Sequence, residues 1–441
     1  MASLPRSLTL AAVALACGAL TAFAQTYPPG VGPDPQLPPP AKKKLIPTVN
    51  IAPAIHWTQG AGPQAPQGFK VTAFAAGLDH PRWVYTLPNG DVLVAETNAP
   101  PPKDGQVDKM KKGITGEAMK LIQRRAGAGV PSPNRIILLR DADGDGVAEV
   151  KTTFMSGLFS PFGMVLVGDE LFIADADAVV KVPYQAGETT ISAQPVKVTD
   201  LPAGANHHWT KNIIASADGS KLYVTVGSNS NVLDNGLASE EGRAAIWEVD
   251  RTNGDKRLFA TGMRNPNGMA WEPQTKALWV VVNERDELGN DLVPDYLTSV
   301  KDGAFYGWPW SYWGQHVDVR AQPPHPDLVA KAILPDYGLG SHVAPLGLTF
   351  SDSHMPGNYA HGAFVGEHGS WNRKQLNGYK VVFVPFSGGK PSGPPEDFLT
   401  GFVSPKGKAF GRPVGVAMDG KGGLLVADDV GNTVWRVAGA K

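Results

Sequence analysis

One strand–turn–strand pattern recurs along most of this chain. In each instance an apolar stretch meets a turn, and a second apolar stretch ends in small or acidic residues. Several of the turns carry Asn-Gly, Asp-Gly or Gly-Gly, which supply the positive φ angles that tight antiparallel hairpins need. The six instances span residues 83–97, 163–176, 212–227, 268–284, 347–369 and 415–429.

Six hairpins of one kind favour an all-β fold, a six-bladed β-propeller with an extended N-terminal tether. Further strands are expected between the units, at residues 178–184, 244–250 and 379–386. A β-sandwich, or two β domains built from similar hairpins, is the alternative. The propeller is preferred because the repeat continues without a linker-like break. Residues 106–125 are the one stretch that is typical of a helix, and they are predicted to lie in an inserted loop.

The N-terminal region is divided in two by its composition. Residues 1–24 are typical of a cleaved secretory signal, with Arg6, an apolar run and Ala22-Phe23-Ala24, so a periplasmic location is expected. The one cysteine, Cys17, lies within it, and the mature chain is expected to have no transmembrane span. Residues 25–66 are predicted to form a Pro-rich, poorly ordered extended tether, and residues 67–441 the propeller.

The first candidates for chemistry are polar residues just before the repeated hairpins. In propellers, ligands usually bind at one end of the central channel, on the loops between strands. His207 and His208 precede the third hairpin, and an imidazole there suits a general base. The alternative is a structural histidine. Arg264 and Asn265 precede the fourth hairpin, where an arginine either binds a carboxylate or caps a turn.

Two acidic segments suit Ca²⁺, which prefers oxygen ligands. Residues 283–314 combine Asp and Glu with a dense set of aromatic residues, which would either wall a pocket or plug the fold. The second segment, DADGDGVAE, places acidic residues at the first, third, fifth and ninth positions of a loop, namely Asp141, Asp143, Asp145 and Glu149. Structural Ca²⁺ is preferred there over an unliganded Asp/Gly turn.

The later hairpins add more charged residues at corresponding positions. His342 precedes the fifth hairpin, His368 and Arg373 follow it, and Arg412 precedes the sixth. In a closed ring such positions converge. Converging arginines beside aromatic residues predict a ligand with several carboxylates or phosphates, and scattered surface arginines are the alternative. The formal net charge of −1 argues against a nucleic-acid partner.

Longer motifs carry a resemblance to a known family. They are the histidine before SADGSKLYVTVG, then GMRNPNGMAW, NERDELGNDLVPDYLTSVKDGAFYGWPW and GRPVGVAMD. With these motifs, residues 67–441 resemble the quinoprotein sugar dehydrogenases of the soluble glucose dehydrogenase and sorbosone dehydrogenase type, and are most similar to the sorbosone dehydrogenase branch.

The resemblance implies pyrroloquinoline quinone (PQQ) and Ca²⁺ at the mouth of the channel. His208 then corresponds to the catalytic base, Arg264 and Asn265 to an Arg-Asn pair beside the quinone, and Arg412 to a cofactor-binding arginine. Asp286 and Asp295 fall in the Ca²⁺ segment. Where the glucose enzymes carry a cofactor-contacting lysine after the fifth hairpin, this chain reads GEHGSWNRK. His368, Arg373 and Lys374 are the candidates for that role, and His342 is a further candidate for a cofactor contact.

The resulting prediction is a PQQ-dependent dehydrogenase that oxidises a sugar or a sugar-derived aldehyde. Without a CxxCH motif for covalent haem, the electrons are expected to pass to an external acceptor, a quinone or a cytochrome. Two alternatives remain open from the residues. One is a Ca²⁺-dependent lactonase or other hydrolase on a propeller, and the other is a non-enzymatic propeller that binds sugars or proteins.

Overall fold

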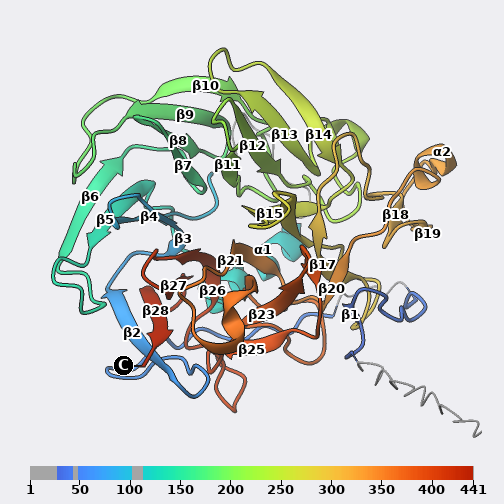
Figure 1. Cartoon of the computed structure of the whole chain (residues 1–441). Coiled ribbons are helices and arrows are strands. Elements are labelled where there is room, and N and C mark those ends of the chain that lie inside the picture. The colour runs from blue at the N-terminus through green and yellow to red at the C-terminus, as the bar shows by residue number, and fades with distance from the viewer. Residues whose placement is uncertain (1–26, 43–47, 102–112, 441) are drawn as a thin grey trace, which may run out of the picture.

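Six antiparallel sheets surround a central axis in the computed structural model, which describes residues 27–42, 48–101 and 113–440. Figure 1 shows these sheets as the blades of a ring. The prediction of an all-β, six-bladed propeller is confirmed. Within the described residues the helices are short: α1 (Gly113–Arg125), α2 (Pro326–Val329) and the 3₁₀ turns η2 (Leu237–Glu240) and η3 (Gly357–Ala360).

Each blade begins with its innermost strand and proceeds outward. Blade 1 consists of β3 (Pro81–Thr86), β4 (Val92–Glu96), β5 (Arg135–Arg140) and β6 (Val150–Ser156). Blade 2 consists of β7 (Met164–Val167), β8 (Glu170–Ala174), β9 (Ala178–Pro183) and β10 (Val196–Asp200). Blade 3 consists of β11 (Ile213–Ala215), β12 (Lys221–Val226), β13 (Ala245–Asp250) and β14 (Lys256–Thr261).

The remaining blades carry additions. Blade 4 consists of β15 (Asn265–Trp271), β16 (Leu278–Asn283), β17 (Pro294–Ser299), β20 (Tyr337–Ser341) and β1 (Val31–Gly32), with the separate hairpin β18 (Ser311–Tyr312) and β19 (His316–Val317) inserted. Blade 5 consists of β21 (Pro345–Phe350), β22 (Gly362–Glu367), β23 (Lys380–Ser387), β24 (Lys390–Pro391) and β25 (Glu396–Leu399). Blade 6 consists of β26 (Pro413–Met418), β27 (Gly423–Asp428), β28 (Thr433–Gly439) and β2 (Phe69–Ala76).

The ring is closed by the two ends of the propeller sequence. Strand β2 pairs with β28 from Phe69 opposite Gly439 to Ala76 opposite Thr433. Figure 1 shows the blue N-terminal strand beside the red C-terminal strand. The last blade is therefore completed by the first strand of the propeller, so the backbone groups along β28 are paired rather than left as an open sheet edge.

A recurring glycine explains how closely the innermost strands approach one another. A Cβ atom on Gly163 would lie 2.5 Å from the Ile213 nitrogen of the next blade, and one on Gly268 would lie 2.5 Å from the Leu348 nitrogen. On Gly347 it would lie 2.2 Å from the Val414 oxygen. These glycines stand at matching places in the repeat. They permit backbone contact between neighbouring blades around the channel, where any side chain would clash.

The N-terminal segment is extended, as predicted, but its described part is packed against the ring. Strand β1 pairs with β20, the Asn50 N–H donates to the Trp371 carbonyl at 2.9 Å, and the Trp57 indole N–H donates to Asp428 at 2.7 Å. Specific contacts therefore join residues 27–42 and 48–66 to the ring. Tryptophan and asparagine side chains supply contacts that the Pro-rich composition did not reveal.

Two other predictions concern the helix at residues 106–125 and the signal sequence. The predicted helix at residues 106–125 forms over Gly113–Arg125, and residues 102–112 lie outside the described part of the chain. The predicted signal sequence, with Cys17, also lies outside it. None of the helices among the described residues is long and apolar enough to cross a membrane.

Candidate functional site

Blade topology brings the singled-out residues to one end of the ring. In every blade the start of the innermost strand pairs with the end of the second strand, as Asn265 with Asn283 and Pro345 with Glu367 show. Residues that precede an innermost strand therefore meet residues that follow a second strand. We call this end of the ring the site face. His208, Arg264, His342 and Arg412 are of the first kind, and Asp286, His368 and Arg373 are of the second.

His208 is held by the end of β12. Its Nδ1 lies 2.9 Å from the Ser228 carbonyl oxygen and 3.0 Å from the Ser228 hydroxyl. Because a carbonyl accepts but cannot donate, Nδ1 carries the proton and Nε2 is the basic nitrogen. Burial and the nearby Arg264 and His207 hold the pKa of His208 well below its usual range. At neutral pH this histidine is therefore uncharged, with Nε2 ready to accept a proton.

Arg264 is buried, and its guanidinium donates hydrogen bonds to three protein acceptors. It donates to the Glu284 carbonyl at 2.7 Å, to the Asn231 carbonyl at 3.3 Å and to the Asp286 carboxylate at 3.1 Å. The next residue, Asn265, has a buried side-chain oxygen without a hydrogen-bond partner in the described structure. Arg264 thus joins the loops that follow β12 and β16 and places a positive charge near His208.

Asp286 and His342 form a buried ion pair. Both ring nitrogens of His342 face acceptors, the Asp286 carboxylate at 3.2 Å and the Gly289 carbonyl at 2.8 Å. Burial lowers the pKa of His342, but Asp286 outweighs it and raises that pKa overall. Burial raises the pKa of Asp286, but Arg264 and His342 hold it below its ordinary value. His342 is therefore engaged in fixing Asp286, with neither ring nitrogen left for a ligand.

Asp295 is occupied by the backbone. Its two carboxylate oxygens accept N–H groups from Glu284 at 2.7 Å and from Ala344 at 2.9 Å. Burial raises its pKa to about 6. Asp286 also accepts hydrogen bonds on both oxygens, so a Ca²⁺ ion at these two residues would share the carboxylates with protein donors.

A second group of charged residues lies on the same face and was missed by the sequence analysis. Asp429, after β27, accepts a hydrogen bond from Arg82 at 2.6 Å and from His368 at 2.9 Å, and His80 lies 3.8 Å away. Burial lowers the pKa of His80 to about 4. His80 directly precedes β3 and Asp429 directly follows β27, so they have the same kinds of position as Arg264 and Asp286, and Arg82 is the second residue of β3. That positional match is the signal that would have found them.

Arg412 and Arg373 differ in what they contact. Arg412 is buried, lies over the Tyr379 ring at 5.0 Å and donates to the carbonyl of Ala52 in the N-terminal segment at 3.1 Å. Arg373 donates to the Ser341 carbonyl at 3.1 Å and pairs with Asp291 at 3.3 Å. Arg412 therefore belongs with the buried cations of the site face, whereas Arg373 mainly joins loops.

The two groups of charged residues are linked by Trp209. This residue directly follows His208, and the Arg82 guanidinium lies 5.6 Å from its ring centroid. Several buried polar atoms around the face have no hydrogen-bond partner in the described structure. They include two donors, the Nε atoms of Arg82 and Arg412, and two acceptors, Oδ1 of Asn265 and Oδ1 of Asp429. Buried groups of this kind normally have partners, so these atoms mark the face as a candidate ligand site.

The aromatic residues that follow the acidic segment do not wall a pocket. Tyr306, Tyr312 and Trp313 are buried in one hydrophobic cluster with strands of blades 3 and 4. Trp308 is also buried, and its indole N–H donates to the Asn231 carbonyl at 3.0 Å. The plug interpretation is therefore the correct one for these residues. Trp308 reaches the site only through Asn231.

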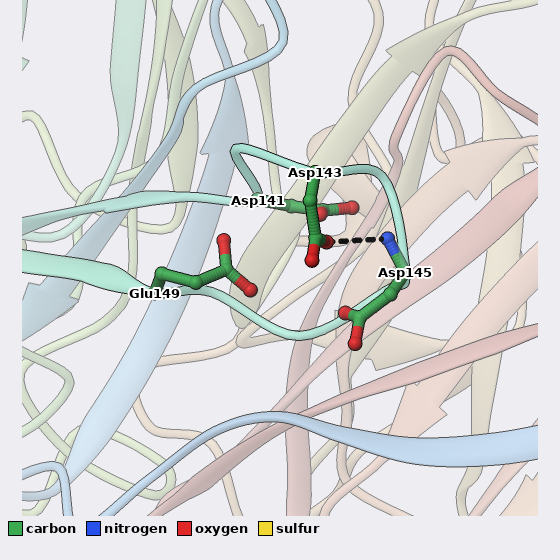
Figure 2. A group of neighbouring side chains, drawn as sticks. All are labelled: Asp141, Asp143, Asp145 and Glu149. Atoms are coloured by element: carbon green, nitrogen blue, oxygen red, sulfur yellow. Dashed lines mark hydrogen bonds between the residues drawn. The ribbon is translucent and has the colours of Figure 1, made fainter.

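The DADGDG loop lies away from the site face. It joins β5 to β6. It therefore lies at one end of blade 1, and the pair Glu96–Arg135, at the site face, lies at the other end. Figure 2 shows its four acidic side chains gathered in one loop, with the Asp145 N–H donating to Asp143 at 3.0 Å. One ligand oxygen from each of Asp141, Asp143, Asp145 and Glu149 lies within 4.8 Å of the others. The loop thus brings together the four residues for which the sequence predicts structural Ca²⁺.

The opposite mouth of the channel holds a cavity of about 710 Å³. It is lined by the ends of innermost strands, including Trp271, Phe350 and Met418. None of the residues singled out from the sequence lines this cavity, so it is distinct from the site face.

Comparisons with known proteins agree on this architecture. The family model TrAA12-like matches residues 135–296 and 329–440. The structure superposes on the PQQ domain of pyranose dehydrogenase from Coprinopsis cinerea with a TM-score of 0.68 and 20% identity, covering 88% of this chain and 100% of the other. A calcium structure of the Trichoderma reesei carbohydrate-active enzyme of family AA12 gives a TM-score of 0.67 and 18% identity, covering 89% and 99%.

A shorter similarity links the chain to a named sugar enzyme. Aldose sugar dehydrogenase YliI of Escherichia coli is 37% identical over 82 residues, which is 18% of this chain and 17% of that protein. The solved structures establish the shared fold, and the short match adds local sequence similarity.

Proposed function

This chain belongs to the TrAA12-like family, and we propose that it is a PQQ-dependent dehydrogenase that oxidises a sugar or a sugar-derived aldehyde. The observation that carries the proposal is the site face itself. A neutral histidine with its basic nitrogen free stands beside a set of buried cations, at the mouth of a propeller channel. Similar folds include the PQQ domain of a pyranose dehydrogenase.

The residues of the site face fit the charge of PQQ, which carries three carboxylates on a planar ring. The Nε atoms of Arg82 and Arg412 are buried donors that no acceptor among the described residues uses. Arg82 and Arg412 would hold carboxylates, because a guanidinium presents several N–H groups in one plane. His368 would act through Asp429, to which it donates a hydrogen bond at 2.9 Å. When bound, PQQ supplies a quinone that accepts a hydride.

His208 would act as the general base. Its Nε2 would take the proton from a hydroxyl of the sugar or of the hydrated aldehyde as the hydride leaves carbon. The hydrogen bond from Nδ1 to Ser228 fixes the ring so that Nε2 is the acceptor. Burial and Arg264 keep the imidazole neutral before the reaction, so the base is available at neutral pH.

Arg264 would contribute through its charge and through Asp286. Its three hydrogen bonds to Asn231, Glu284 and Asp286 leave it fixed in place. A fixed positive charge stabilises negative charge that develops nearby, without the cost of reorganising solvent. Asn265 follows it in the chain and is the other member of the Arg-Asn pair that the resemblance implies beside the quinone.

Ca²⁺ would bind in the DADGDG loop, and the Ca²⁺ site that the resemblance implies at Asp286 and Asp295 stays a prediction. The loop gathers four carboxylates, which is the ligand type that Ca²⁺ prefers. Calcium there would be structural, since the loop lies at the other end of blade 1 from the site face.

Three further parts of the proposal concern the surroundings of the reaction. The electrons would pass to an external acceptor, a quinone or a cytochrome. The enzyme would work in the periplasm after removal of residues 1–24. Within sugars and sugar-derived aldehydes, the motifs favour sorbosone-like substrates.

The variant His208→Gln tests the proposal. Glutamine keeps the size of the side chain but cannot act as a base near neutral pH. We expect PQQ to bind as in the wild type, while dye-linked oxidation of aldoses and aldehydes falls by a factor of about 100 or more. His354→Gln, at an exposed position, is the matched control. Unchanged turnover in His208→Gln would refute the role of this residue, and lactone hydrolysis without PQQ would refute the dehydrogenase.

A further inference from the structure

The hydrogen bond from the His208 ring to Ser228 lies beyond the point where the ladder between β11 and β12 ends. The ladder between β11 and β12 ends at the pair Ile213–Val224, and one more contact links Asn212 and Thr225. His208 and its acceptor Ser228 both lie beyond that point. The His208 N–H donates to the Ser228 carbonyl at 3.3 Å, and side chains add further bonds between the loop that carries His208 and the end of β12.

Arg243 makes this connection. It lies in the turn before β13 and is only 6% exposed. One terminal nitrogen donates to the Gly227 carbonyl at 3.2 Å, next to the residue that accepts the bond from His208. The other donates to the loop that carries His208, at the Ala203 carbonyl (2.5 Å) and the Asn206 side chain (3.1 Å). A single planar guanidinium thus grips both segments at once.

Lys211 supports the same loop from the other side of His208. It is fully buried, and its ammonium group donates to the Trp209 carbonyl at 3.1 Å, with Asn206 at 3.5 Å. Burial holds the pKa of Lys211 well below its usual range. A lysine in such a place is costly to fold, so its position around the His208 loop calls for a function.

Glu240 completes the arrangement on the side of Ser228. Its carboxylate accepts the Asn229 N–H at 2.6 Å and the Ser230 hydroxyl at 2.5 Å. The Asn229 side chain in turn accepts the His207 N–H at 3.1 Å. The backbone on both sides of Ser228 is therefore held by side chains from the connection between β12 and β13. Within that connection, the Arg243 backbone N–H donates to the Glu240 carbonyl.

We propose that Arg243 is a positioning residue for His208, and that it keeps the imidazole in the form with the proton on Nδ1 by fixing the Ser228 carbonyl against it. The inference rests on the proposed role of His208 as the base. Three charged or titratable side chains act on His208, namely Arg264, His207 and Arg243. Of these, Arg243 is the one that bonds to both segments joined by the His208–Ser228 hydrogen bond.

The consequence for catalysis follows from the two nitrogens of imidazole. If the Ser228 carbonyl turned away, the proton could move to Nε2, and the ring would then present an N–H where the reaction needs an acceptor. The binding of the cofactor and substrate would change little, because Arg243 bonds to the carbonyls of Gly227 and Ala203 and to the Asn206 side chain rather than to His208 itself. The loss would appear in kcat more than in KM.

The test measures the protonation of His208 directly. In protein labelled with ¹⁵N in histidine, two-bond ¹H–¹⁵N spectra report which ring nitrogen carries the proton, and His208→Gln identifies the signal. We expect the Nδ1–H form in the wild type and in Arg257→Met, a control at an arginine of the same blade that is 49% exposed. In Arg243→Met we expect a mixture of the two forms. Arg243→Lys, which keeps the charge but lacks the fork, should be intermediate.

Activity is the second readout, and it separates the possible failures. With PQQ added, Arg243→Met should lose about 10- to 100-fold in kcat with KM changed less than about threefold. A folded Arg243→Met or Arg243→Lys with a pure Nδ1–H signal would overturn the inference, as would an Nε2–H signal in the wild type. The spectra need no cofactor, so a wild type that lacks dehydrogenase activity but shows the expected change of form would refute only the proposed function.

Discussion

The buried histidine beside Asp429 predicts a measurable proton uptake when the protein unfolds. His80 is 3% exposed, and burial lowers its pKa from 6.5 to about 4, with Arg82 and His368 adding to the lowering and Asp429 opposing it. Between these two pH values the unfolded chain binds a proton at His80 and the folded protein does not. Stability therefore falls as the pH drops from 6.5 towards 4.

The magnitude follows from the same two values. The difference between 6.5 and about 4 corresponds to roughly 3 kcal/mol of the free energy of unfolding, lost over that pH range. Near the middle of the range, at a pH of about 5.3, unfolding should take up about 0.9 proton at His80 alone. The variant His80→Gln removes this uptake and leaves the contributions of other groups in place.

Potentiometric measurement of proton uptake on unfolding in urea is the direct assay. At a pH of about 5.3, the wild type should take up about one proton more than His80→Gln. The control His354→Gln, at a side chain that is 67% exposed, should match the wild type. Equal uptake by His80→Gln and the wild type would refute the argument that His80 is buried in its neutral form.

Three further predictions test other parts of the account. Arg412→Met should weaken PQQ binding at least about tenfold in an absorbance titration, because the buried guanidinium is lost. Unchanged affinity would mean that Arg412 does not bind the cofactor. Trp57→Ala should lower the free energy of unfolding by about 3 kcal/mol in urea melts, because Trp57 stacks on Phe410 and donates a hydrogen bond to Asp428. An unchanged midpoint would mean that the N-terminal segment does not stabilise the ring. Ca²⁺ should raise the melting temperature of the wild type but not of Asp143→Asn, and an equal rise in both would place the ion elsewhere.

The fold was predictable because one pattern repeats. The hairpins with their turn dipeptides identified all six blades, and the glycines of the repeat mark where the innermost strands touch. The contacts between the N-terminal segment and the ring were not predictable. These contacts come from single residues such as Asn50 and Trp57 that meet loops more than 300 positions away in the sequence. Composition alone describes such a segment as an extended tether.

The site was predictable in outline, through position in the repeat. His208, Arg264, Asp286 and His342 do lie on one face, and Arg264 contacts Asp286. What the sequence could not give is how each group is used. Both oxygens of Asp295 are taken by backbone N–H groups, which depends on the exact course of two loops. Arg82 and Asp429 were missed because each is ordinary alone, and they become a pair only when the ring closes.

The most direct test of the central claim is a titration of PQQ into the purified protein. Absorbance would follow binding, and reduction of an artificial dye would follow turnover on aldoses and sugar-derived aldehydes. The account predicts saturable binding of PQQ at the site face, lost in the double variant Arg82→Met/Arg412→Met, together with dye reduction by the wild type. Absence of PQQ binding by folded protein would contradict it, and the buried cations would then belong to a different anionic ligand.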